Sequence, residues 1–359
     1  MVRAYRTLPL AFLLFRMRVP TMRALPLSLT LLVLVPAARG ADTWQPVAIQ
    51  LLAKEKTGFG GLTGVVVDRA TGTLYVCLSD AGIFRSDDQG KTWARYGRGG
   101  KDATKGRTET PGCFQLDPTG KTKQFLMATV YGGPTVIGST DPDLAWRAVD
   151  KKCQHVDWCA VDWADENMTF MLAFKHEANG LLLRSLDGGK SFDEVGKGYG
   201  FGAWVFDEKT AVVAVAKGPE KVARDGYIVR TTDGGKTFKP VSKSVPVCLP
   251  KPQGDALYWL CQGELVRGTD KGAKWEKVCD VKDARYGPIF GTDAKTLFVL
   301  TSAGVIESTD GGVTWGKPLA VPKELKGVNG LTWLEYDPKN DALYVMKMGT
   351  DLYKLSRAK

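Results

Sequence analysis

The chain has two histidines, and each stands beside an acidic residue, which makes them the first candidates for chemistry. Asp157 follows His155 by two positions, and Glu177 directly follows His176. An imidazole with a carboxylate neighbour suits general acid–base catalysis, and the same groups can bind a metal ion. Two exposed loop histidines with no special role would give the same pattern. The sequence leaves these three interpretations open.

Two kinds of polysaccharide chemistry need few further residues. A glycosidase needs two carboxylates across a cleft, and candidates outside strand-like runs are Asp102, Glu109, Asp157, Glu177, Asp225 and Asp283. A polysaccharide lyase needs a His or Tyr base near a positive group. For that reaction the adjacent pair Arg285-Tyr286 joins the two histidines as a candidate catalytic set. No spacing selects one reaction over the other.

Aromatic residues near these candidates offer flat faces to sugar rings. They are Tyr131, Trp158, Tyr199 and Trp204, with Phe201 between the last two. Aromatic side chains also fill the space between packed sheets. Both a ligand-binding role and a packing role are therefore open for each of them.

A repeated phrase indicates the elements that must position these residues. Ser86-x-Asp88-x-Gly90-x-Thr92-Trp93 returns around Asp187, Asp233 and Asp310, and two degenerate copies contain Asp141 and Asp270. A repeat of about 40 to 50 residues is typical of propeller blades or solenoid coils. Each copy follows a strand-like run and precedes an aromatic residue, which predicts a hairpin turn. The aspartate accepts backbone N–H groups of that turn, and six equivalent turns are a structural feature and not a catalytic one.

The phrase closely resembles the Asp-box, or BNR repeat, of bacterial sialidases, sortilin-type receptors, xyloglucan-cleaving hydrolases and photosystem II assembly factors. The resemblance implies an all-β fold, a seven-bladed β-propeller of four-stranded antiparallel blades, with six blades as the fallback. It implies no single activity, because enzymes and non-enzymes share the box.

Strand-like runs around the boxes predict the blades. The first blade takes Gly64–Val67, Leu74–Leu78, Gly82–Ser86 and Trp93–Tyr96, and the same order recurs in 112–149, 155–196, 200–242, 247–279 and 284–319. The last blade has only three such runs, Leu331–Tyr336, Ala342–Lys347 and Asp351–Leu355. We expect Trp44–Gln50 to supply its fourth strand and close the ring.

In propellers of this kind, the connections between blades gather at one mouth of the central channel and the Asp-boxes lie on the opposite rim. The resemblance therefore implies that a ligand meets the inter-blade connections, where both histidines are expected. The sialidase comparison also implies three arginines that clamp a carboxylate. The arginines outside the repeat that could reach this mouth are Arg98, Arg107, Arg224 and Arg285. We assign Arg224 to ligand binding. The sialidase Arg-Ile-Pro phrase is missing, and Glu335-Tyr336 cannot both enter one pocket because neighbours on a strand point to opposite faces.

Residues 1–40 have the composition of a secretory leader. They hold six arginines, no acidic residue and an apolar run from Leu25 to Val35, which is too short to span a bilayer, and Met22 is a credible true start. Without them, 43 basic residues remain against 39 acidic ones, a net charge of about +4. We expect a secreted or periplasmic protein that has one domain over residues 41–359, no transmembrane segment and no nucleic acid partner, and is a monomer.

Seven cysteines follow the predicted leader, and export would permit disulfides. Cys248 and Cys261 flank a predicted turn at Gly254-Asp255, and Cys153 and Cys159 bracket a short loop. Both pairs are candidate disulfides, and an odd cysteine remains. Since metal and cofactor motifs are missing, we expect neither a resident metal nor a cofactor. The leading hypothesis is a non-catalytic binding or assembly scaffold for a protein or glycan. The alternative is a carbohydrate-active enzyme: a sialidase-like exo-glycosidase, another glycoside hydrolase or a polysaccharide lyase.

Overall fold

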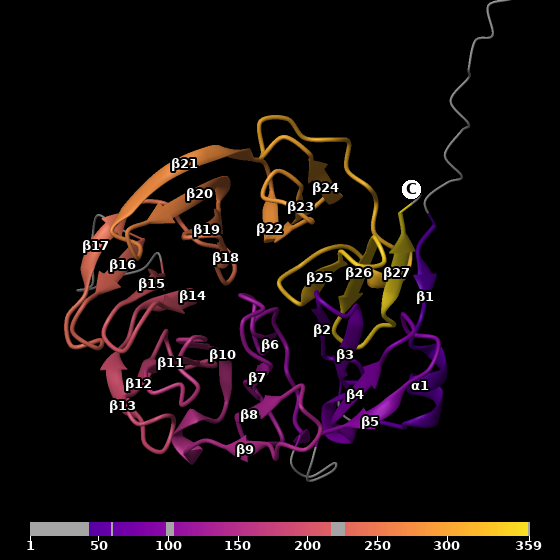
Figure 1. Ribbon diagram of the computed structural model, residues 1–359, viewed down its shortest axis with the longest axis horizontal. Helices are drawn as coiled ribbons and strands as arrows, with labels where there is room; N and C mark the ends of the chain where they lie inside the picture. Colours follow the sequence, from indigo (N-terminus) through magenta and orange to yellow (C-terminus); the bar gives the residue numbers. More distant parts are fainter. Residues whose placement is uncertain (1–42, 59, 98–103, 217–226, 358–359) are drawn as a thin grey trace, which may run out of the picture. The chain divides into compact units, whose positions relative to one another are not determined.

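The computed structural model of the protein describes residues 43–58, 60–97, 104–216 and 227–357 (Figure 1). The predicted leader and Arg224 lie outside the described residues. The described chain belongs to one compact unit, Ala41–Lys359, and is built almost wholly of β-strands.

Each blade is an antiparallel sheet whose strands follow one another along the chain from the channel outward, except that the outermost strand of blade seven is the N-terminal β1. Blade one is β2 (Gly64–Asp68), β3 (Thr73–Cys77), β4 (Ile83–Ser86) and β5 (Ala94–Tyr96), and blade two is β6 (Phe114–Leu116), β7 (Gln124–Met127), β8 (Val136–Ser139) and β9 (Arg147–Ala148). Blade three is β10 (Val156–Val161), β11 (Met171–Lys175), β12 (Leu182–Ser185) and β13 (Asp193–Gly196). Blade four is β14 (Tyr199–Val205), β15 (Ala211–Val215), β16 (Ile228–Thr231) and β17 (Lys239–Ser242).

Blades five to seven continue the pattern. Blade five is β18 (Lys251–Gln253), β19 (Ala256–Cys261), β20 (Gly263–Thr269) and β21 (Lys274–Val281). Blade six is β22 (Ala284–Phe290), β23 (Leu297–Thr301) and β24 (Gly304–Ser308). Blade seven is β25 (Thr332–Asp337), β26 (Ala342–Lys347), β27 (Tyr353–Ser356) and β1 (Gln45–Pro46). In blade six, Leu319 forms an isolated bridge with Val305 that marks the fourth strand position. The predicted seven-bladed propeller is confirmed.

The ring closes through the N-terminal strand, as predicted. Gln45 pairs with Lys354 and Pro46 with Tyr353 in an antiparallel register. The closing strand is much shorter than the predicted Trp44–Gln50, because the chain turns into helix α1 (Ile49–Lys54) soon after Pro46. The Ala48 N–H then donates to Asp351 Oδ1 at 2.8 Å. These contacts join the two ends of the described chain in one blade.

The Asp-box turns share one set of hydrogen bonds. At the third box, Ser185 Oγ donates to Asp187 Oδ1 at 2.8 Å and accepts the Gly189 N–H at 2.9 Å. Ser191 donates its N–H to Oδ1 at 3.0 Å and its hydroxyl to Oδ2 at 2.6 Å. Hydrogen bonds of the same kind surround Asp88, Asp233 and Asp310, which agrees with the predicted structural role.

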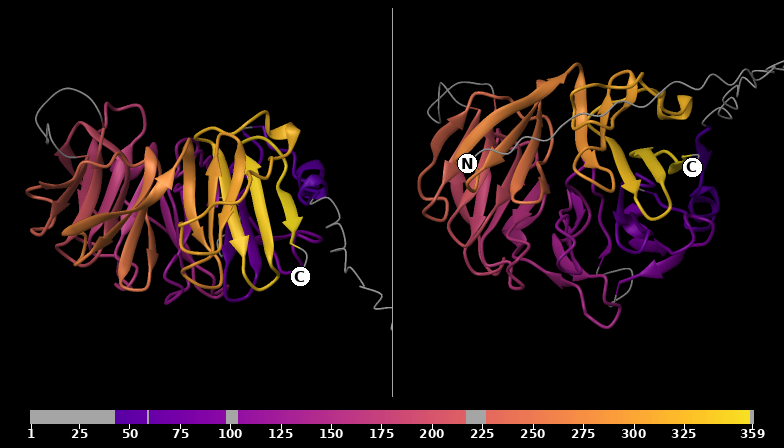
Figure 2. Two further views of the ribbon diagram at one scale, coloured as in Figure 1. Left: turned by 90° about the horizontal axis from the view of Figure 1, so that it is seen from above. Right: turned by 45° about the horizontal axis from the view of Figure 1, so that its top comes forward.

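The strands run between two faces of the ring (Figure 2). The face with the Asp-box turns, here called the box face, also carries the turns between first and second strands, since Thr73 Oγ1 donates to Asp87 at 2.8 Å. The other face, called the loop face, carries the connections between blades and the turns between second and third strands. These two faces offer different sites.

Candidate functional site

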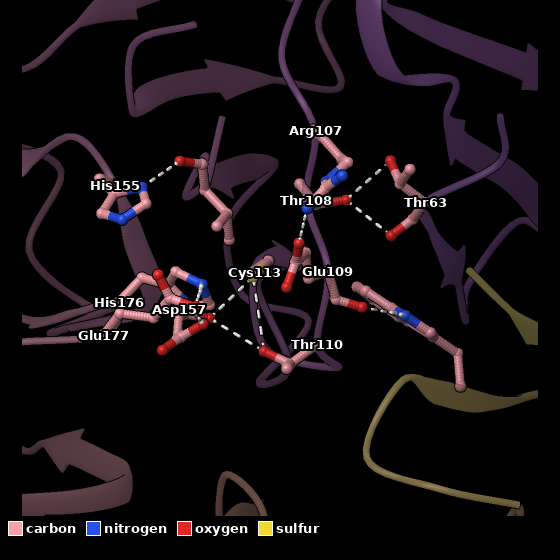
Figure 3. Close-up of polar contacts among 12 residues, drawn as sticks. Thr63, Arg107, Thr108, Glu109, Thr110, Cys113, His155, Asp157, His176 and Glu177 are labelled. Carbon is pink, nitrogen blue, oxygen red and sulfur yellow. Dashed lines mark hydrogen bonds and ion pairs between the residues drawn. The ribbon is translucent and has the colours of Figure 1, made fainter. Parts of the chain in front are cut away.

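The two histidines lie side by side on the loop face (Figure 3). His155 directly precedes β10 and His176 directly follows β11, and these strands are antiparallel neighbours. The His176 N–H donates to the His155 carbonyl at 2.8 Å. The two ring centroids are 4.9 Å apart with the ring planes at 88°. The hairpin therefore brings together two residues that are 21 positions apart in sequence.

Both imidazoles are held through Nδ1. His155 Nδ1 lies 2.8 Å from the Val130 carbonyl oxygen, and His176 Nδ1 lies 2.8 Å from Asp157 Oδ1. Because a carbonyl or carboxylate oxygen accepts, each Nδ1 is the donor in these contacts, and neither Nε2 takes part in them. Asp157 is buried, and burial raises the pKa of its carboxyl group while the hydrogen bond from His176 opposes that rise.

Further side chains surround this pair. Tyr131 presents its ring to His155 at 4.9 Å and to His176 at 5.7 Å between centroids. The Arg107 guanidinium lies 4.5 Å from the Tyr131 ring centre and pairs with Glu109. Glu177 Oε1 lies 3.5 Å from His176 Nε2. The structure thus brings together Asp157, Glu177, Tyr131 and both histidines from the predicted set.

A cavity of about 410 Å³ opens beside this cluster. Its lining includes Glu109, Asp157, His176, Glu177, Phe174 and Phe201. Phe201 is 46% exposed at this cavity. Trp158 is 1% exposed and stacks on Phe174 at 5.5 Å, and Tyr199 is 4% exposed against Phe238. Trp158 and Tyr199 therefore have the packing role, whereas Phe201 presents an exposed ring to the cavity and Tyr131 is half-buried beside the histidines.

A second, larger cavity of about 680 Å³ occupies the channel. Tyr286 of β22, Lys251 of β18 and Glu335 of β25 all line it, and so does Trp204. Lys251 Nζ donates to the Tyr286 hydroxyl at 3.2 Å. Burial raises the pKa of Glu335 to about 7, against the opposing effect of Lys251 and Arg69. Burial also raises the pKa of Tyr286 to about 12.

Strand alternation separates the two adjacent pairs considered from the sequence. Tyr286 faces the channel, while Arg285 is exposed elsewhere. Glu335 faces the channel, while Tyr336 is 5% exposed and donates its hydroxyl to Asp341 at 2.9 Å. The structure instead groups Tyr286 with Glu335 and Lys251, a combination that sequence reasoning missed. The alternation of inward and outward side chains along β22 and β25 could have placed Tyr286 and Glu335 in the channel. Grouping them with Lys251 also requires knowing which blades are neighbours in the ring.

Leu249 reaches from blade five to other blades and lines the channel cavity. It precedes β18 in blade five, yet a Cβ added at Gly112 in blade two would lie 2.6 Å from Leu249 Cδ1. Leu249 also belongs to the buried cluster around Trp158 of blade three. The channel cavity extends from there to the first turns on the box face, including Ala70, Thr71, Pro118 and Thr292.

All seven cysteines are free thiols in the structure. Cys153 Sγ and Cys159 Sγ lie 3.7 Å apart, both buried. Cys248 Sγ instead contacts the Gly287 carbonyl oxygen at 3.1 Å, and Cys261 Sγ contacts the Trp259 carbonyl oxygen at 3.6 Å. Neither predicted disulfide is formed here. Of the two predicted pairs, Cys153 and Cys159 have their sulfurs in direct contact, whereas Cys248 and Cys261 do not.

The comparisons with known proteins agree with this architecture. A family model described as BNR/Asp-box repeat matches residues 84–95, around the first box. No curated protein matches the sequence. The chain is a seven-bladed β-propeller that carries Asp-box repeats.

Solved structures of the same fold include enzymes and binding proteins. The chain is similar to a GH74 enzyme of Niastella koreensis, with a TM-score of 0.54, 17% identity, and coverage of 88% of this chain and 54% of that one. It thus spans about half the length of that enzyme. For the β-propeller domain of Cps50 (Swd1) from Myceliophteria thermophila, the TM-score is 0.59 and the identity 13%, with coverage of 84% of this chain and 99% of that one. For YCF48 bound to D1 peptide, the TM-score is 0.50 and the identity 13%, with coverage of 83% of this chain and 93% of that one. At these identities the likeness shows the fold.

Within the part of the chain that the structure describes, no helix is long and apolar enough to cross a bilayer.

Proposed function

We propose that this protein is an exported, non-catalytic scaffold that binds a protein or glycan ligand in the loop-face cavity. The observation that carries the proposal is that ionisable side chains of this cavity are paired with other protein side chains. Asp157 bonds to His176 and Glu109 pairs with Arg107, so these carboxylates are held by protein partners. The exposed ring of Phe201 lies at the same cavity and offers an apolar contact. Export rests on the sequence of residues 1–40 alone.

The fold neighbours support a scaffold as readily as an enzyme. One of them was solved as YCF48 bound to D1 peptide, which shows that a propeller of this general form can hold a peptide. That comparison does not identify a ligand for this chain. The ligand class therefore has to come from a direct binding experiment.

The test is an array of acidic and neutral polysaccharides and of peptides, scored for both retention and released product. We expect retention without product. Phe201→Ala should weaken binding about 5- to 30-fold, the range of a contact residue at the centre of an interface. Leu144→Ala is the matched control, because Leu144 is 55% exposed and lies outside the cavity lining. Equal binding by both variants would contradict the proposed site.

A second candidate function, cleavage of a glycan in the channel cavity, is supported by Glu335. A carboxyl group with a pKa of about 7 holds its proton near neutral pH and can act as a general acid. Product released by the wild type and lost in Glu335→Gln, with Phe201→Ala unaffected, would replace the scaffold proposal with this one.

A further inference from the structure

We propose that His155, His176 and Glu177 form a binding site for a divalent transition-metal ion, with Zn²⁺ the best-suited ion. This inference goes beyond the proposed scaffold function and does not depend on it. The sequence offers these residues as possible metal ligands but predicts no resident metal, because they come from two ends of a hairpin and match no spacing motif. The structure places their side chains in one cluster on the loop face (Figure 3).

The donor atoms are already close to the spacing that a metal needs. One donor atom from each of the three residues lies within 4.8 Å of the other two, and His176 Nε2 is 3.5 Å from Glu177 Oε1. Tetrahedral bonds of about 2.0–2.1 Å put neighbouring donors roughly 3.3 Å apart. The Glu177 side chain is 72% exposed, so it can change its rotamer when an ion binds.

The hydrogen bonds of both histidines match the arrangement that orients metal-binding histidines. Such histidines donate the ring N–H that does not bind the metal to a carboxylate or a backbone carbonyl. His176 Nδ1 faces the Asp157 carboxylate and His155 Nδ1 faces the Val130 carbonyl, each at 2.8 Å. In this arrangement Nε2 is the ring nitrogen of each histidine that would bind the ion. Asp157 is a positioning residue in this site and not a ligand.

The donor set favours particular ions. Two imidazole nitrogens and one carboxylate suit Zn²⁺ and its transition-metal neighbours, whereas Mg²⁺ and Ca²⁺ prefer sites built of oxygen alone. Three protein ligands leave a fourth tetrahedral position open. Because Glu177 is exposed, we expect that position to face solvent and to hold water or a carboxylate from a bound molecule.

The experiment is a calorimetric titration of the full chain, stripped with a chelator and kept reduced, with ZnCl₂. We expect one equivalent to bind. His155→Gln and His176→Gln should each weaken binding at least 10-fold, and Glu177→Gln should weaken it as well. Asp157→Asn should weaken it 10- to 100-fold, as loss of a second-shell carboxylate does. Glu194→Gln is the matched control, an exposed carboxylate on β13 of the same blade, and should bind as the wild type does.

Thiols are the competing ligands, and Co²⁺ distinguishes them. A tetrahedral cobalt complex of nitrogen and oxygen donors absorbs in the visible range without the near-ultraviolet thiolate-to-cobalt charge-transfer band. That spectrum, lost in both His variants and altered in Asp157→Asn, would support the site. Thiolate absorption would overturn the proposed site. Zn²⁺ binding that is unchanged both in Glu177→Gln, a variant of an exposed residue, and in a folded His155→Gln/His176→Gln variant would overturn it as well.

Discussion

At the scale of single residues, the channel holds a carboxyl group whose pKa is raised toward neutrality. Glu335 and Lys251 share the cavity with Tyr286, and the carboxyl group has a pKa of about 7 against an ordinary 4.5. A carboxyl group is usually ionised at neutral pH. Here the loss of hydration on burial outweighs the nearby positive charges, so the neutral form persists to higher pH.

Glu335→Gln should therefore change how stability depends on pH. Between about pH 4.5 and 7 the folded protein keeps a proton that the unfolded chain has released, so the free energy of unfolding of the wild type falls as pH rises. The variant lacks this proton and should gain stability relative to the wild type between pH 5 and pH 8. Urea denaturation at both pH values measures the difference, with Glu194→Gln as the control. Parallel pH curves for all three proteins would contradict the pKa assignment.

Some site residues were predictable because the relevant geometry is local. His155 and His176 flank one hairpin, so reading the strands was enough to place both on the same face. Glu335 and Leu249 were not predictable in the same way. The environment of Glu335 comes from β18 and β22, and Leu249 contacts blades on the far side of the ring. Such contacts depend on the curvature of the whole ring, which no local pattern encodes.

At the scale of elements, the Asp-box turn stabilises the hairpin between the third and fourth strands. The hydrogen bonds from Ser191 lower the pKa of Asp187 to about 2, followed in effect by those from Ser185. A lowered pKa means that this stabilisation is complete above about pH 4 and disappears as pH falls toward 2. The box thus adds to acid sensitivity.

Asp187→Ala should lower the free energy of unfolding by about 1 kcal/mol at pH 7, the typical loss when a side chain that caps backbone N–H groups is removed. The deficit should shrink below pH 4, where the wild-type carboxylate is protonated. Asp270→Ala is the matched control, because this aspartate occupies a degenerate box. Among the described residues its carboxylate pairs with Lys274 at 3.8 Å in place of the box hydrogen bonds. A loss as large in that variant would argue against a special role for the box.

The loop between Cys153 and Cys159 should be closed by mild oxidation. Their sulfurs lie 3.7 Å apart, and the bond would enclose His155 and Asp157 in a short ring. Loop-closure entropy for about seven residues gives a gain of about 2 kcal/mol. Peptide mapping without reduction detects the cross-link, and thermal denaturation measures the gain, with Cys153→Ser as the control. Mapping that shows a different cysteine pair would refute the assignment.

At the scale of the whole molecule, the ring depends on contacts between the two ends of the described chain. The fold was predictable because six turns repeat a local pattern, and closure was predictable because the last blade lacked one strand. The length of the closing strand was not, since α1 begins where a longer strand was expected. Burial of Leu51 and the hydrogen bond from Ala48 to Asp351 depend on residues about 300 positions away.

Asp351→Ala should weaken this closure. Ala48 is fully buried, and the variant leaves its N–H without the carboxylate acceptor, which costs about 1–3 kcal/mol. Hydrogen exchange should speed up over residues 45–48 before the other blades respond. Asp255→Ala, at an exposed turn, is the control. Uniform exchange across all blades would show that the ring opens as one unit.

The same closure sets an order of events during synthesis. Gln45 leaves the ribosome long before its partner Lys354, and at about 5–20 residues per second the delay is on the order of 15 to 60 s. Until then the apolar side of blade one that later packs against Trp333 and Tyr344 has no cover. The nascent chain is therefore most prone to aggregate just before its last blade emerges, and a chaperone that shields the first blade would act in that interval.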